Sequence, residues 1–200
     1  MTAKSNTHAN EFRSLTLVAQ CPDPEEFEAD VFKLTDSLGH FNVEESTHFN
    51  VLRGELKLRV TYQKQNQSYG ELIAYKRSPT SVDGVYLAEG SITGVQDVDN
   101  LKNTLRIALS ELGTLNAKRR VFATDKITIH LDEIEELGTF IQIDIALPSN
   151  SEPSQEELTL MSELQCSLHI KPSHLIPNSY LELYRKKRSS DSGLDEESSD

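Results

Sequence analysis

Apolar and polar residues alternate along much of the chain, and a period of two is typical of strands with one buried face. The clearest case is residues 127–147, where isoleucine or leucine takes every second place on both sides of an acidic turn that contains a glycine. The polar places between them hold His130, Asp132, Gln142 and Asp144. This segment therefore predicts a hairpin with an apolar face and a polar face.

The same alternation predicts eight strands, and a period near 3.6 predicts four helices between and after them. The strands cover residues 13–20, 41–51, 54–63, 70–77, 85–92, 115–124 and the two arms of 127–147. The helices cover residues 22–39, 97–113, 151–170 and 178–187. This order predicts an α+β fold in which an eight-stranded antiparallel barrel carries helices packed outside.

The composition narrows the class of protein. The chain has 200 residues, a formal net charge of −12 and a pI near 4.9, which disfavour wholesale binding to nucleic acid or to anionic membranes. No apolar run approaches the ~20 residues of a membrane span, and no signal-peptide pattern opens the sequence. Cys21 and Cys166 lie far apart and lack metal-ligand spacing, so we expect them to be buried free thiols in a reducing compartment. We therefore expect a cytoplasmic protein, with the nucleus as an alternative.

Three segments differ in character. Residues 1–12 are polar and are expected to be flexible, and residues 13–186 form one domain. Residues 187–200 are rich in serine and acid and are expected to be a disordered tail. The tail has two interpretations. It is either a solvating segment without further function, or a segment whose serines are phosphorylated by acidophilic kinases or form a variant phosphodegron.

Strand period places five cations on a few strand faces, opposite the apolar residues. They are Lys57, Arg59, Arg77, Lys118 and Arg120. If the isoleucine faces pack under the helices, these cations share one interior with His130, Asp132 and Asp144. The alternative is a set of solvated faces with weak surface ion pairs.

Several of these segments resemble a known family. NVLRGELKLRV, GELIAYKR, AKRRVF and ITIHLDEIEELGTFIQIDI are similar to successive strands of the CYTH superfamily, the triphosphate tunnel metalloenzymes, and PNSYLELY resembles the end of its CyaB-type (class IV adenylyl cyclase-like) branch. The resemblance runs from about Arg13 to Tyr184. It implies an eight-stranded tunnel in which basic side chains hold a triphosphate and carboxylates hold Mg²⁺ or Mn²⁺.

Carried across residue by residue, the resemblance assigns phosphate binding to the five cations and metal binding to Asp132 and Asp144. The family signature Glu-x-Glu-x-Lys on the first strand is replaced by Ser14, Thr16 and Val18, and Gln142 stands where the last strand has its first Glu of Glu-x-Glu. Two of five expected carboxylates remain. The sequence therefore predicts a degenerate metal site beside a retained cationic one.

Three functions stay open on this basis. The first is a binding or interaction module with little or no catalysis, whose tunnel takes a nucleotide, triphosphate or polyphosphate. The second is an active triphosphate hydrolase, or an adenylyl cyclase, that uses Mg²⁺ or Mn²⁺. The third is a scaffold with a vestigial tunnel, which binds a protein partner through its surface or its C-terminal tail.

Overall fold

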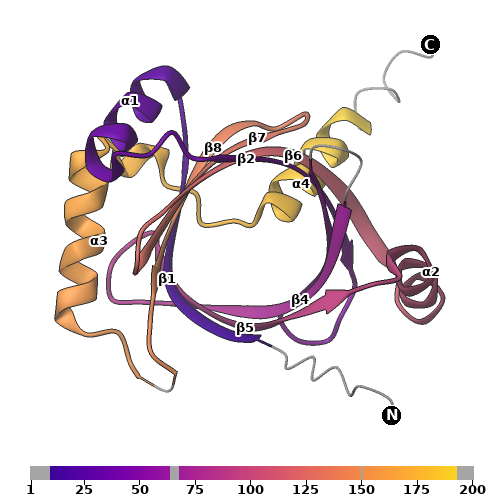
Figure 1. Ribbon diagram of the computed structural model, residues 1–200. Coiled ribbons are helices and arrows are strands. Elements are labelled where there is room, and N and C mark those ends of the chain that lie inside the picture. Colours follow the sequence, from indigo (N-terminus) through magenta and orange to yellow (C-terminus); the bar gives the residue numbers. More distant parts are fainter. Residues whose placement is uncertain (1–9, 64–67, 150, 193–200) are drawn as a thin grey trace.

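Eight antiparallel strands close into a barrel in the computed structural model, which describes residues 10–63, 68–149 and 151–192 (Figure 1). The strands are β1 (Asn10–Gln20), β2 (His40–Phe49), β3 (Glu55–Tyr62), β4 (Ser68–Pro79), β5 (Val85–Val95), β6 (Glu111–Ala123), β7 (Ile127–Ile134) and β8 (Gly138–Ala146). Their order around the barrel is β1-β5-β4-β3-β2-β6-β7-β8. The predicted fold class is therefore confirmed.

Helices lie outside or at the end of this barrel (Figure 1). They are α1 (Pro24–Thr35), α2 (Val98–Ala108), α3 (Gln155–Ser167) and α4 (Tyr180–Ser192), with a 3₁₀ turn at Pro172–His174. None of the helices in the described part of the chain has the length and apolar character needed to cross a membrane. Ser154 forms the predicted capping box with Glu157 at the start of α3.

The main hydrophobic core lies between the outer face of the barrel and helices α1 and α3. The alternating isoleucines of β8, such as Ile143 and Ile145, are fully buried there beside Leu15 and Leu17 of β1. Val31 of α1 and Met161 of α3 cover them with no exposed surface. Because the apolar faces of β1, β7 and β8 pack under the helices, the polar faces of these strands turn toward the barrel axis.

The first strand closes the barrel. It pairs on one side with β5 and on the other with β8, where Thr16 lies opposite Asp144 and Val18 lies opposite Gln142. The residues at the positions predicted to be degenerate on the first and last strands therefore lie side by side.

Several predicted boundaries are wrong. The helix expected over residues 97–113 ends at Ala108, and Gly113 lies inside β6, where it pairs with His48 next to a bulge at Leu112 of β6. The last helix runs to Ser192, so residues 187–192 are helical and not part of a disordered tail. Residues 10–12 belong to β1, while the rest of the expected flexible segments, 1–9 and 193–200, lie outside the described residues.

Candidate functional site

The barrel encloses a cavity of about 450 Å³, lined by inward side chains of all eight strands and by the residues that lead into α4. The lysine and arginine side chains on its wall are Arg13, Lys57, Arg59, Arg77 and Arg119. Volumes in this range are typical of small-molecule sites. The cavity is therefore the candidate site of the protein.

Three of the five predicted cations face this cavity. Lys57 and Arg59 point inward from β3, and Arg77 points inward from β4. Their inward direction follows from strand period, since the alternate residues Leu58 and Val60 are buried on the other face of β3.

The predicted positions of Lys118 and Arg120 are wrong. Lys118 forms an exposed ion pair with Glu133, with Nζ 3.0 Å from Oε1. Arg120 lies on the outer face, where its Nη1 is 2.6 Å from Oε2 of Glu28 in α1. Both side chains turn away from the cavity, and Arg119 between them turns into it.

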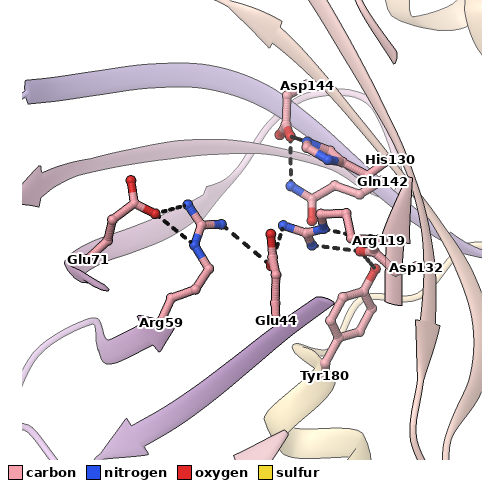
Figure 2. Close-up of polar contacts among 9 residues, drawn as sticks. All are labelled: Glu44, Arg59, Glu71, Arg119, His130, Asp132, Gln142, Asp144 and Tyr180. Carbon is pink, nitrogen blue, oxygen red and sulfur yellow. Dashed lines mark hydrogen bonds and ion pairs between the residues drawn. The ribbon is translucent and has the colours of Figure 1, made fainter. Parts of the chain in front are cut away.

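Arg119 binds the most deeply buried carboxylate of the interior. Its Nε donates to Asp132 Oδ1 at 2.6 Å and its Nη2 donates to Oδ2 at 2.7 Å (Figure 2). Tyr180, at the start of α4, donates its hydroxyl to the same Oδ2 at 3.1 Å and packs on Phe140. Asp132 has no exposed surface, so it lies beneath these two side chains and not on the cavity wall.

The protonation state of Asp132 follows from these contacts. Burial opposes ionisation, but the charge of Arg119 and its two hydrogen bonds hold the pKa of Asp132 below its usual value. The carboxylate is therefore ionised and committed to a structural pair.

Glu44 of β2 lies between two of the tunnel arginines (Figure 2). Its Oε2 is 3.5 Å from Arg119 Nη1 and 3.8 Å from Arg59 Nη1. Arg59 also donates from Nε and Nη2 to Glu71 Oε2, at 3.0 and 2.7 Å. The carboxylate of Glu44 thus takes a place between guanidinium groups where the oxygens of an anionic ligand would otherwise bind.

Arg77 has a similar partner on the neighbouring strand. Its Nη2 donates to Glu55 Oε1 at 3.0 Å, and the hydroxyl of Tyr75 donates to the other oxygen of Glu55 at 2.8 Å. The guanidinium also lies 5.7 Å from the ring centroid of Tyr86. Each tunnel arginine is therefore matched by a carboxylate of the protein itself.

The positions predicted to be degenerate form one hydrogen-bonded corner between β1 and β8. Thr16 donates to Asp144 Oδ1 at 2.6 Å, and Gln142 donates to Oδ2 at 2.7 Å. Ser14 lies 3.2 Å from Thr16 Oγ1, and because the Thr16 proton points to Asp144, Ser14 is the donor of that contact. His130 Nε2 lies 3.2 Å from Asp144 Oδ2.

These contacts set the charge of Asp144. Burial would raise its pKa, but the hydrogen bond and the charge of His130, together with those from Thr16 and Gln142, lower the pKa below the usual value. Val18 completes the corner on the cavity wall with an apolar side chain.

The residues present do not fit a Mg²⁺ or Mn²⁺ site. Such an ion needs several oxygen ligands with free lone pairs, usually from carboxylates. Of the two carboxylates that the resemblance assigns to the metal, Asp132 is bound by Arg119 and Tyr180 and does not line the cavity, so Asp144 alone remains. Among the residues that the structure describes, no three His, Cys, Asp or Glu side chains gather as a metal site.

The comparisons with known proteins point to the fold. No family model matches the chain, and a search of curated proteins gives no match. The protein PH1012 from Pyrococcus horikoshii OT3 is similar in structure, with a TM-score of 0.69, 17% identity and coverage of 85% of this chain and 98% of that one. The predicted tunnel fold is confirmed.

Two further solved structures share this fold, although they come from different kinds of protein. HpAC1 from Hippeastrum, a proposed adenylyl cyclase with a dominant triphosphatase activity, has a TM-score of 0.59 and 14% identity, over 87% of this chain and 96% of that one. A chain of the Mediator head module from Schizosaccharomyces pombe has a TM-score of 0.58 and 7% identity, over 80% of this chain and 95% of that one. At these identities the likeness shows a shared fold and nothing further.

Sequence reasoning missed the arginine and the carboxylates that organise the tunnel. Arg119 could have been found from Phe122, which has the parity of Lys118 and Arg120 and packs in the outer core. Glu71 could have been found from strand pairing, because it lies directly opposite Arg59. Tyr180 lies in the segment PNSYLELY, but its contact with Asp132 was not predicted, because it is made from the start of a helix far along the chain.

Proposed function

We propose that the protein is a binding module whose tunnel takes a triphosphate-bearing anion, such as a nucleotide or a polyphosphate, with little or no turnover. The observation that carries this proposal is the meeting of Lys57, Arg59, Arg77 and Arg119 around one open cavity. Guanidinium groups bind phosphate oxygens through two donors at once, which makes arginine the usual phosphate ligand. Membership of the CyaB-type branch and a cytoplasmic or nuclear location belong to the same proposal.

The direct test is calorimetric titration of the purified protein with tripolyphosphate and with ATP, each with and without Mg²⁺ or Mn²⁺. We expect binding that weakens as salt rises, because the contacts are ionic, and that changes little with the divalent ion. An affinity that depends strongly on Mg²⁺ would instead favour a metal-dependent enzyme, and a triphosphatase activity is named for the Hippeastrum neighbour. No binding of either ligand would favour a scaffold, for which the Mediator head module supplies a fold-level precedent.

Catalysis is expected to be absent or very weak. A phosphoryl-transfer site must stabilise developing negative charge with ions or donors fixed in place. In this chain Ser14, Thr16 and Gln142 are neutral, and the oxygens of Asp144 are held by neighbours. The measurement is phosphate or pyrophosphate release from ATP, GTP, thiamine triphosphate and tripolyphosphate, and robust turnover that Asp144→Asn abolishes would contradict the proposal.

Glu44 should limit the affinity of the tunnel for anions, because its carboxylate lies against both Arg59 and Arg119. We expect Glu44→Gln to tighten tripolyphosphate binding roughly fivefold, which corresponds to about 1 kcal/mol for one charged contact removed. The arginines keep Glu71 and Asp132 as partners, so the fold should be retained.

The matched control for this change is Glu133→Gln, which removes a carboxylate from the exposed pair with Lys118. It alters the net charge by the same amount and should leave the affinity within twofold. If both variants tighten binding equally, the effect comes from net charge and not from competition inside the tunnel.

A further inference from the structure

Lys57 differs from every other cation on the tunnel wall. Arg13, Arg59, Arg77 and Arg119 each form an ion pair with a carboxylate. Among the described residues no carboxylate forms an ion pair with Lys57. Its ammonium group instead makes a cation–π contact with Tyr75, in which Nζ lies 5.6 Å from the ring centroid. The amine therefore borders the cavity without an anionic partner.

The strands on either side of Lys57 present groups of low polarity. Its cross-strand neighbours are Ile73 of β4 and His48 of β2. Burial lowers the pKa of His48 to about 3, so the imidazole is neutral, and its Nδ1 is buried without a hydrogen-bond partner. An isoleucine, a tyrosine ring and a neutral imidazole solvate an ammonium group poorly.

The environment of the amine lowers the pKa of Lys57 on balance. Burial, then Arg59 and then Arg119 lower the pKa of Lys57 to about 8, while Glu44 and Glu55 oppose the shift. At pH 7.5 an amine with such a pKa is neutral in about a quarter of the molecules, against roughly one in a thousand for an ordinary lysine. Desolvated lysines beside other cations are nucleophiles of this kind.

We propose that Lys57 is a covalent capture site for a small phosphorylated aldehyde or ketone, which it binds as an imine. The proposal rests on the proposed function, because Arg59 and Arg119 hold the phosphate of the ligand. The lone pair of Nζ adds to the carbonyl carbon, and both hydrogens of the neutral amine leave with the carbonyl oxygen as water. The step is reversible and requires no oxidant or reductant.

The experiment uses pyridoxal 5′-phosphate as the probe, followed by borohydride reduction and peptide mapping by mass spectrometry. We expect reduced adduct at Lys57 at least tenfold faster than at the exposed lysines Lys76 and Lys118, although those are more accessible to solvent. Lys57→Arg keeps the positive charge and should abolish the fast adduct, whereas Lys118→Arg should leave it unchanged. Even labelling of all lysines, or no adduct at Lys57, would overturn the proposal.

Two further arms separate this inference from the proposed function. Protection of Lys57 by tripolyphosphate, with slower labelling by pyridoxal than by its phosphate, supports both. Equal labelling of Lys57 by the two aldehydes without protection keeps the reactive amine but overturns anion binding in the tunnel. Calorimetric binding of tripolyphosphate with no selective adduct at Lys57 overturns the imine site and leaves the proposed function standing.

Discussion

Replacing Arg119 by methionine is expected to lower the free energy of unfolding by about 3–5 kcal/mol, because the change leaves a fully buried carboxylate unpaired. Asp132 has no exposed surface and takes both of its strongest hydrogen bonds from this arginine. The remaining contact from Tyr180 donates one neutral hydroxyl and cannot replace the lost charge. Urea denaturation followed by circular dichroism measures the loss.

The neighbouring Arg120→Met is the matched control, since it removes the same side chain from the outer face of the same strand. Its pair with Glu28 is partly exposed, so the expected loss is below about 1 kcal/mol. Equal losses at the two positions would contradict the placement of Arg119 inside the barrel. The double change Arg119→Met with Asp132→Leu should recover part of the stability, because it also removes the unpaired charge.

Arg59→Ala is expected to weaken tripolyphosphate binding roughly ten- to a hundredfold, since a charged hydrogen bond contributes about 1.5–3 kcal/mol. Arg59 reaches the cavity from the middle of β3 and has three nitrogens near carboxylates that a phosphate can replace. Calorimetric titration at low salt, on variants shown to be folded by circular dichroism, measures the change.

Lys118→Ala is the control, and it separates two assignments of the tunnel wall. The family resemblance implied that Lys118 is a phosphate ligand, whereas the structure places it in an exposed pair with Glu133. We therefore expect its affinity to stay within twofold of the unchanged protein. A loss as large as that of Arg59→Ala would mean that anions bind on the outer face of β6.

The fold could be predicted from the sequence because most strands have an unambiguous buried face. In residues 127–131 of β7 and 141–145 of β8 isoleucine or leucine takes every second place, and the helices cover that face as expected. The same alternation fixed the direction of Gln142 and Asp144, and strand pairing then brought Thr16 and Val18 beside them. One apolar row was enough to orient both faces of these strands.

The wall of β6 could not be read in this way because Lys118, Arg119 and Arg120 are all basic. Three consecutive cations give no contrast between the two faces, so these three residues alone do not show which of them point into the barrel. The choice is made by packing outside the charged stretch, where Phe122 enters the core beneath α1. A shift by one residue moves every side chain to the other face, which explains why two predicted ligands were lost together.

The end of α2 could not be predicted from the sequence for a different reason. Leucines at 109 and 112 continue the helical stripe, and Gly113 has the character of a cap. In the structure β6 begins at Glu111, because the long pairing with β2 extends to that residue. The hydrogen bonds of the sheet override the local helical preference, and nothing in the local sequence records that partner.

The position of β1 between β5 and β8 governs the order in which the chain can fold. Its partners begin at Val85 and end at Ala146, so the first strand finds its second neighbour only after almost all of the barrel has been synthesised. Until then Leu15 and Leu17 have no complete core to enter, and the edge of the strand that faces β8 is open. Pairings over such separations make closure slow, and the nascent chain is exposed to aggregation until β8 arrives.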